Sequence, residues 1–212
     1  MALGFHFEKD FMLNNTGLKG KLFIISAPSG AGKTSVTAGV IKFLQNLISI
    51  EKTITFTTRK HRVSEIAGKD YNFISTSEFL ALKKEGYFLE TTEYDGNYYG
   101  SPASIISELK AGKSLIMITD RAGAKNFKNN ILPDSVTIWL TVPSLDVLRQ
   151  RLEHRKTESQ CSLDKRLKLA EEEIAQEADE PFFQYHVLND DLEKSIRSIA
   201  KIIQQELLQK SN

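Results

Sequence analysis

Residues 22–34 read Leu-Phe-Ile-Ile-Ser-Ala-Pro-Ser-Gly-Ala-Gly-Lys-Thr, and this stretch decides the fold. Its first four residues form a compact apolar run, which is typical of a strand buried on both faces of a parallel sheet. After the glycine-rich turn, Val36, Val40, Leu44 and Leu47 recur at helical spacing. The stretch therefore predicts a strand, a turn and a helix in immediate succession.

The turn itself is a partial match to Gly-x-x-x-x-Gly-Lys-[Ser/Thr], because Ala27 stands at the first glycine position. Backbone N–H groups of such a loop converge on phosphate oxygens, and the N-terminus of the following helix adds positive potential. Lys33 is expected to reach the β- and γ-phosphates of a nucleotide, and the Thr34 hydroxyl to hold Mg²⁺ bound with it. An ordinary turn with an exposed lysine is the alternative, which the flanking strand and helix disfavour. The predicted phosphate site consists of Ser29, Gly30, Ala31, Gly32, Lys33 and Thr34.

Short apolar runs alternate with amphipathic stretches along the rest of the chain, which indicates an α/β fold. We expect a P-loop NTPase core in which helices flank a parallel sheet. Leu163, Leu167, Ala170 and Ile174 mark one helix, with Glu171–Glu173 mostly on its solvent side. Two further buried strands are predicted at 115–118 and 136–140, and another strand is predicted near 185–188.

Residues 53–101 break this rhythm, because they alternate β-branched, aromatic and charged side chains. We interpret them as a small β-rich insertion beside the core. Residues 146–184 are helical in pattern and highly charged, and we interpret them as a lid. The remaining predicted parts are an N-terminal extension at 1–20 and the core segments 21–52, 102–145 and 185–212.

Size and charge limit the classes of protein that the chain can belong to. The 212 residues suffice for one substantial core. Lys and Arg total 28 against 27 Asp and Glu, and this balance argues against a general nucleic-acid binder. No apolar run approaches the roughly 20 residues that span a bilayer, so no membrane association is expected.

Cysteine use and the N-terminus favour a cytoplasmic location. Cys161 is the single cysteine and cannot form an internal disulfide. The N-terminus also lacks the layout of a signal peptide. The sequence leaves the oligomeric state open, and a homo-oligomer is compatible with it.

Arg59 and Arg62, three residues apart, have the chemistry to bind a second phosphate. Guanidinium groups grip phosphate with paired donors, so two of them can hold a dianionic monophosphate. Tyr71 and Tyr99 can add hydroxyl donors to the same phosphate. On the residues alone, an equal alternative is that these arginines are solvent-exposed surface charges of the insertion with no binding role.

Three further residues have the chemistry to recognise guanine. This base presents N1–H and N2–H₂ donors beside its O6 acceptor. The carboxylate of Glu90 can accept both hydrogen bonds, and the hydroxyl of Thr55 or Ser101 can donate to O6. Adenine would leave one of these groups unpaired and would therefore be rejected.

In their order and spacing these motifs resemble the guanylate kinases, a family of P-loop nucleoside monophosphate kinases. The central motif is Thr-Thr-Arg-x-x-Arg-x-x-Glu-x-x-Gly-x-Asp-Tyr-x-Phe at Thr57–Phe73. The similarity covers about residues 21–207. It continues through Phe88-Leu89-Glu90, Gly96–Ser101, Arg151-Leu-x-x-Arg155, Asp164–Leu167 and Asn189–Leu192.

The resemblance implies transfer of the ATP γ-phosphate to GMP, and also to dGMP, with Mg²⁺ as the cofactor. It makes residues 53–101 the GMP-binding insertion and places Asn189 near the adenine of ATP. The implied catalytic residues are Lys33, Arg151, Arg155 and Arg166. The implied GMP site consists of Arg59, Arg62, Tyr71 and Tyr99 for the phosphate, and of Thr55, Glu90, Ser101 and Asp120 for the base.

One segment departs from the family pattern Leu-Asp-Ile-Asp-x-Gln-Gly. At 117–123 this chain retains Asp120, but Ile118 replaces the first acid and Ala122 replaces the glutamine. We therefore expect activity that is weakened or shifted in preference. Two alternatives stay open: a kinase of the same fold acting on another phosphorylated acceptor, such as ribose 1,5-bisphosphate, and a non-catalytic interaction module.

Overall fold

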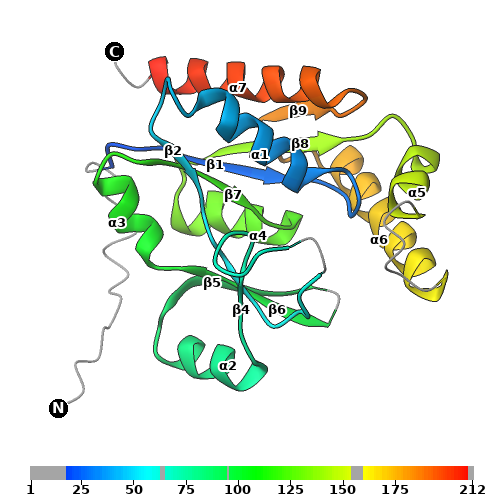
Figure 1. The fold of residues 1–212 in the computed structure, drawn as a ribbon, viewed down its shortest axis with the longest axis horizontal. Helices are drawn as coiled ribbons and strands as arrows, with labels where there is room; N and C mark the ends of the chain where they lie inside the picture. The colour runs from blue at the N-terminus through cyan, green and yellow to red at the C-terminus, as the bar shows by residue number, and fades with distance from the viewer. Residues whose placement is uncertain (1–17, 63–64, 95, 154–159, 210–212) are drawn as a thin grey trace.

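The computed structural model describes residues 18–62, 65–94, 96–153 and 160–209. Its larger sheet has five strands, all parallel, in the order β2-β7-β1-β8-β9 (Figure 1). The predicted α/β core is confirmed, and the runs at 115–118, 136–140 and 185–188 lie in β7, β8 and β9. The five strands are β1 (Leu22–Ser26), β2 (Ile50–Lys52), β7 (Ser114–Ile118), β8 (Val136–Thr141) and β9 (Tyr185–Leu188).

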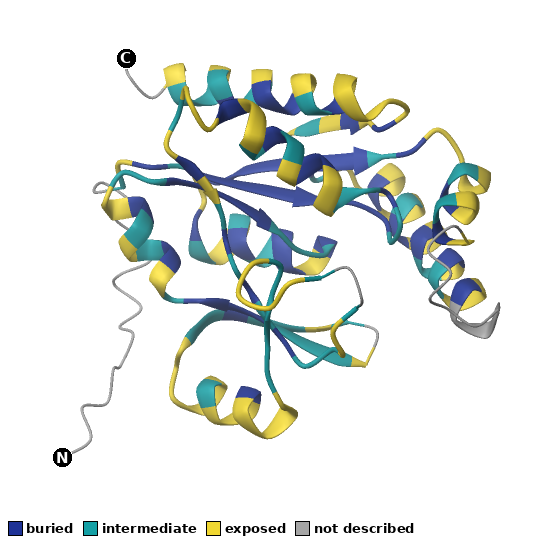
Figure 2. Ribbon diagram, in the orientation of Figure 1, coloured by how far each residue is buried: buried dark blue, intermediate teal, exposed yellow. Residues whose placement is uncertain are grey.

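Helices cover both faces of this sheet, and each face carries its own apolar core. Successive side chains of a strand point to opposite faces. Phe23 and Ile25 of β1 therefore pack with α1 and α7, whereas Leu22 and Ile24 pack with α3 and α4. This double cover explains why β1 is buried along its whole length (Figure 2). The helices are α1 (Lys33–Leu44), α3 (Ser104–Lys110), α4 (Arg121–Asn126), the π-helix η2 (Phe127–Ile131) and α7 (Leu192–Leu208).

The connection after β1 begins the functional part of the molecule. The chain leaves β1 towards β2 and β7 on one side, and β8 and β9 lie on the other, so the strand order reverses beside β1. Ligands of open parallel sheets bind at the carboxyl ends of the strands at such a point. Gly30 (φ 90°) and Gly32 (φ 96°) adopt the left-handed conformation there, which a residue with a Cβ rarely adopts. Gly32 begins α1 and has no side chain that could cap the first N–H groups of the helix.

A second sheet of four strands, in the order β4-β3-β6-β5, lies below the first in the view of Figure 1. Residues 53–101 supply nearly all of it, as the β-rich prediction expected. Stacked rings form its small core, with centroids 4.8 Å apart for Phe79 and Phe88 and 5.5 Å apart for Phe79 and Tyr98. The strands are β3 (Phe56–Thr57), β4 (Asn72–Phe73), β5 (Phe88–Tyr94) and β6 (Asn97–Pro102).

The insertion also contains a helix that the sequence analysis did not predict, α2 (Thr76–Lys84). A capping box starts it: the Glu78 N–H donates to the Ser75 hydroxyl, and the Ser75 N–H donates to the Glu78 carboxylate. A serine followed three residues later by glutamate is a recognised signal for a helix start. The alternating pattern around this segment obscured that signal.

Two helices lie beyond the carboxyl ends of β1 and β8 (Figure 1): α5 (Leu145–Glu153) and α6 (Gln160–Asp179). Leu148, Leu152 and Leu167 pack into the same core as α1, so both helices are fastened to the large sheet. The proposed domain boundaries and the lid role of residues 146–184 stay predictions.

Two expectations about individual side chains were wrong. Leu47 does not continue the buried face of α1, because the helix ends at Leu44 and Leu47 is 66% exposed. Glu173 does not lie on the solvent side of α6, because α6 crosses the edge of a pocket and buries this side chain to 7% exposure.

Candidate active site

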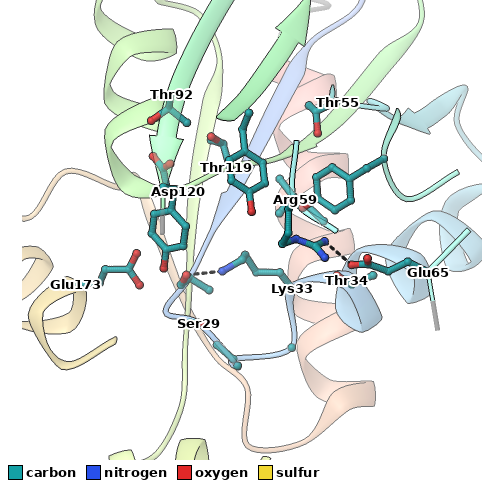
Figure 3. A pocket seen from close by; sticks show the side chains of 18 of the residues that line it. Ser29, Lys33, Thr34, Thr55, Arg59, Glu65, Thr92, Thr119, Asp120 and Glu173 are labelled. Carbon is teal, nitrogen blue, oxygen red and sulfur yellow. Dashed lines mark hydrogen bonds and ion pairs between the residues drawn. The ribbon is translucent and has the colours of Figure 1, made fainter. Parts of the chain in front are cut away.

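One pocket is lined by residues of both sheets, with the loop after β1 at one end and the inserted sheet at the other (Figure 3). The strand ends, the loop and α6 all contribute side chains to it. The tertiary structure therefore brings most of the predicted site residues together. The predicted residues that line this pocket are Ser29, Gly30, Ala31, Gly32, Lys33, Thr34, Thr55, Arg59, Arg62, Tyr71, Glu90, Tyr99, Ser101, Asp120 and Arg166.

At the loop end, positive charge comes from two elements. The Lys33 ammonium, at the start of α1, donates to the carbonyl of Ala27. Arg166 of α6 donates to the Ser29 hydroxyl through Nε at 3.0 Å and through Nη2 at 2.7 Å. A lysine, a guanidinium group and a helix N-terminus thus converge on one loop, which suits the binding of phosphate groups.

Two predicted residues, Arg151 and Asn189, contact the loop without lining the pocket. Asn189 donates from Nδ2 to the Ala31 carbonyl at 2.7 Å, and Arg151 donates from Nη2 to the Asn189 carbonyl at 2.8 Å. Asn189 Oδ1 in turn accepts from the Ser195 hydroxyl at 3.0 Å. These contacts hold the conformation of the loop. Arg155 lies outside the described residues.

In the part of the lining that the inserted segment supplies, Arg59 and Arg62 share one carboxylate. Arg59 Nη2 lies 2.7 Å from Glu65 Oε1, and the Arg62 N–H donates to Glu65 Oε2 at 3.0 Å. Burial opposes the charge on Arg59, but the hydrogen bond to Glu65, the charge of that carboxylate and the contribution of Tyr99 together outweigh it and raise the pKa of the guanidinium group. Burial also acts on Glu65, yet Arg59 and Arg62 lower the pKa of its carboxyl. The Arg59 guanidinium is therefore charged and held by Glu65 before any ligand binds.

Tyr71 and Tyr99 lie beside this arginine pair. Their ring centroids are 6.2 Å apart, and the Arg59 guanidinium lies 5.5 Å from the centroid of Tyr71. Burial, and then the neighbouring Tyr99, raise the pKa of Tyr71 to about 12. Its hydroxyl therefore keeps its proton at neutral pH and can donate it to an anion.

A further set of buried polar side chains lines the same pocket. Glu90 of β5 pairs with Ser101 of β6 in the small sheet, and Thr55 precedes β3; all three are less than 9% exposed. Burial, and then the charge of Asp120, raise the pKa of Glu90 to about 7. Asp120 also begins α4, because its Oδ1 accepts from the Gly123 N–H at 2.7 Å. It serves as a helix cap and lines the pocket at the same time.

The pocket also contains residues that sequence reasoning missed. Thr92, Tyr94, Thr119 and Glu173 line it together with the predicted set. A signal for Glu173 was present, since it follows Arg166 by seven residues and so lies on the same helical face. Ile118, the apolar residue at the position where the resemblance implies an acid, is another lining residue.

A metal site made of protein side chains alone is not found among the described residues, since no three His, Cys, Asp or Glu side chains gather there. The Thr34 hydroxyl and the Asp120 carboxylate do line the pocket. Oxygen ligands of this kind suit Mg²⁺, which usually takes few protein ligands and completes its shell with water and substrate phosphates. The donor set therefore fits a magnesium ion that arrives with a nucleotide.

Within the described ranges, no helix is sufficiently long and apolar to cross a membrane.

Comparisons with known proteins agree on one family. The family model described as guanylate kinase matches residues 19–206. A guanylate kinase of Rubrobacter xylanophilus is 38% identical over 87% of this chain and 94% of that relative. A guanylate kinase of Coxiella burnetii is 37% identical over 91% of this chain and 90% of its own. The crystal structure of guanylate kinase from Anaplasma phagocytophilum superposes with a TM-score of 0.71 at 28% identity, covering 90% and 87% of the two chains.

Proposed function

The chain belongs to the guanylate kinase family, and from this premise we propose that it transfers the γ-phosphate of ATP to GMP, giving ADP and GDP. One observation carries the proposal. A single pocket joins a phosphate-binding loop to an arginine pair, two tyrosine hydroxyls and a buried carboxylate. These groups match a triphosphate at one end and a guanine monophosphate at the other.

The ATP end uses the loop and the basic residues around it. Lys33 neutralises the β- and γ-phosphates, and Arg166 approaches from α6 on the side of Ser29. Arg151 and Asn189 act through the Ala31 carbonyl, which they keep in place. Asn189 near the adenine and Arg155 near the transferring phosphate stay predictions from the resemblance. The proposed ATP-binding residues are Ser29, Gly30, Ala31, Gly32, Lys33, Thr34 and Asn189.

The GMP end divides into a phosphate site and a base site. Arg59 and Arg62 hold the phosphate with paired donors, and the hydroxyls of Tyr71 and Tyr99 add to them. Glu65 supports this by holding the Arg59 guanidinium and the backbone N–H of Arg62. The base site is formed by Thr55, Glu90, Ser101 and Asp120.

The transfer needs no covalent enzyme intermediate. An oxygen of the GMP phosphate forms a bond to the γ-phosphorus of ATP, while the bond from that phosphorus to the β,γ-bridging oxygen breaks. The bonding electrons leave with ADP. Because two anions must meet, the protein contributes positioning and positive charge from Lys33, Arg151, Arg155 and Arg166.

Magnesium would be held by the Thr34 hydroxyl, and by Asp120 through its water shell. When bound with ATP it supplies further positive charge at the β- and γ-phosphates. Ile118 offers no carboxylate at this place. We therefore keep the expectation that activity is weakened or shifted in preference by Ile118 and Ala122.

Release of ADP from Mg-ATP tests the proposal, with GMP, dGMP, AMP, UMP and ribose 1,5-bisphosphate offered separately. We expect release with GMP, and with dGMP, which differs only at the 2′-position. Lys33→Ala should abolish release, since the γ-phosphate loses its neutralising ammonium group. Release with ribose 1,5-bisphosphate but not GMP, or with none of the five acceptors despite measurable ATP binding, would refute the proposed function.

A cytoplasmic location, no binding of nucleic acid and an open oligomeric state, homo-oligomers included, stay predictions from the sequence. Sedimentation of the purified chain measures its oligomeric state directly.

A further inference from the structure

Helix α6 brings an acidic side chain into the phosphate end of the pocket. Glu173 is buried and lies in the same lining as Ser29 and Lys33. Figure 3 shows it reaching in from α6, on the side towards which the Lys33 side chain extends. The groups that act on its carboxyl are the Lys33 ammonium, the hydroxyl of Tyr94, the backbone N–H of Ser29 and, with the opposite effect, the Asp120 carboxylate.

The carboxyl of Glu173 is only partly satisfied. Its Oε2 is buried and has no hydrogen-bond partner among the described residues. Burial raises the pKa of this carboxyl, against the opposing effects of Lys33 and the Tyr94 hydroxyl. A buried carboxyl oxygen without a partner is unfavourable, so the attraction of Lys33 has to compensate for it.

The groups that face Glu173 are those that a nucleotide requires. In a phosphate-binding loop the backbone N–H groups and the lysine are the donors for the phosphates of ATP. A carboxylate oxygen and a phosphate oxygen are both anionic acceptors, so they compete for the same donors. If both were present, they would also repel each other within a poorly screened pocket.

We propose that Glu173 is an internal competitor of the ATP phosphates: its carboxyl faces Lys33 and the Ser29 N–H until Mg-ATP takes these donors and displaces it. This inference rests on the proposed function and extends it to the way in which the ATP site becomes available. Arg166, on the same face of α6, donates to Ser29. Helix α6 therefore carries one group that attracts the nucleotide and one that competes with it.

The C-terminal part of α6 is held in place, which limits how the Glu173 carboxyl can be displaced. Glu177, one turn after Glu173, is 4% exposed and its Oε2 lies 3.1 Å from Arg121 Nε. Its Oε1 accepts from the backbone N–H groups of Phe182 and Phe183. With Glu177 held in this way, and with Leu167 and Ala170 packed into the core, the movement should be confined to the Glu173 side chain.

Equilibrium binding of Mg-ATP without any acceptor tests the proposal, measured by titration calorimetry. Glu173→Gln should lower the Kd for Mg-ATP about tenfold, a coupling of ordinary size between two sites. Glu173→Ala should act in the same direction without adding an amide donor. Glu172→Gln is the matched control, because it removes the same charge from an exposed position on the same helix and should leave the Kd unchanged. An unchanged or raised Kd in both Glu173 variants would overturn the proposal.

A second variant keeps the test decisive if changes at Glu173 prevent folding, which near-UV circular dichroism would reveal. Tyr94→Phe removes a hydroxyl that favours the charged carboxyl in its inward position, so it should also lower the Kd for Mg-ATP. An unchanged or raised Kd in this variant would then overturn the proposal. Because GMP is never added, these results do not depend on which acceptor the enzyme uses. Failure of the proposed function would appear separately, as absence of GMP-dependent ADP release.

Discussion

Glu90 belongs to the proposed base site, and its surroundings oppose the negative charge that would bind guanine. Burial, and then the carboxylate of Asp120, raise the pKa of Glu90 to about 7. The N1–H and N2–H₂ groups of guanine both require an acceptor, which the ionised carboxylate provides and the protonated acid provides only in part. GMP should therefore bind to the molecules in which Glu90 is ionised, and the fraction of such molecules changes around neutral pH.

The KM for GMP should accordingly rise as the pH falls below about 7, approaching tenfold per pH unit. The sign follows from the raised pKa: below it the carboxyl is protonated in the absence of GMP, and the proton must be lost on binding. Initial rates at saturating Mg-ATP between about pH 6 and pH 8 measure this.

Glu90→Gln provides the control for that profile. The phosphate of GMP itself titrates near pH 6, and this variant retains that titration while lacking the carboxyl. Its KM should be higher throughout and should vary less with pH. A wild-type KM for GMP that stays constant over this pH range would show that the ionised carboxylate of Glu90 does not bind guanine. The same conclusion would follow if the KM of Glu90→Gln varied with pH as steeply as that of the wild type.

At the scale of single elements, α2 shows how a local signal can define a helix inside a β-rich segment. The hydroxyl of Ser75 accepts from the Glu78 N–H at 3.2 Å, and the Glu78 carboxylate accepts from the Ser75 N–H at 2.9 Å. Phe79, the next residue, is fully buried against Phe88 and Tyr98. The capping box fixes the start of α2, and the ring of Phe79 packs the helix against the inserted sheet.

Ser75→Ala should lower the free energy of unfolding by about 1 kcal/mol, because the first turn of α2 loses its side-chain acceptor. The shift of the urea midpoint at constant slope measures this. Ser107→Ala is a suitable control, since that exposed hydroxyl only donates back to a carbonyl of its own helix. Equal effects of the two changes would mean that the cap contributes nothing.

The link between α4 and α6 depends on a buried ion pair. Arg121 and Glu177 are 8% and 4% exposed, and Arg121 Nε lies 3.1 Å from Glu177 Oε2. Arg121 Nη2 also donates to the backbone carbonyls of Gln176 and Glu180. Removing the guanidinium group would deprive the buried Glu177 Oε2 and the Glu180 carbonyl of this donor, although Glu177 Oε1 would keep the N–H groups of Phe182 and Phe183.

Arg121→Ala should therefore cost about 3–5 kcal/mol in the free energy of unfolding, as expected when one partner of a buried pair is lost. The exposed pair of Arg197 and Glu193 on α7 provides the comparison. Arg197→Ala should change stability by less than about 1 kcal/mol. Chemical denaturation of both variants measures the difference, and similar losses would show that burial adds nothing to the α4–α6 link.

At the scale of the whole molecule, the two sheets supply different parts of the pocket lining. The large sheet carries the phosphate loop, whereas the small sheet and the chain leading into it supply most of the GMP end. The small sheet is also the less buried of the two, as Figure 2 shows by its mostly intermediate residues. Ligands at the two ends should therefore stabilise different parts of the chain.

GMP alone should slow amide hydrogen exchange in β3, β5 and β6 and leave β9 and α7 nearly unchanged. At about one hundred times its Kd it should add roughly 2.7 kcal/mol to global stability. Exchange followed by mass spectrometry measures the first effect, with AMP as the control nucleotide. Protection spread evenly over both sheets, or equal protection by AMP, would contradict the assignment of the GMP end.

The sequence by itself determined the parts of this protein that depend on neighbouring residues. Residues 22–44 specify a buried strand, a loop and a helix, because an apolar run, two glycines and a helical spacing are local signals. The arginine pair and Glu90 were candidate phosphate and guanine ligands from their side-chain chemistry, and the structure places them in one pocket. The order of the motifs then indicated the guanylate kinase family, which the comparisons confirm.

Only the tertiary structure decided which distant groups meet. Arg166 reaches Ser29 across 137 residues, and Asn189 reaches the Ala31 carbonyl across 158. The burial of Glu173, the raised pKa of Glu90 and the shared use of Glu65 by two arginines arise in the same way. Burial and electrostatic environment are properties of the packed molecule, since they depend on all the elements that surround a side chain and not on its neighbours in the chain.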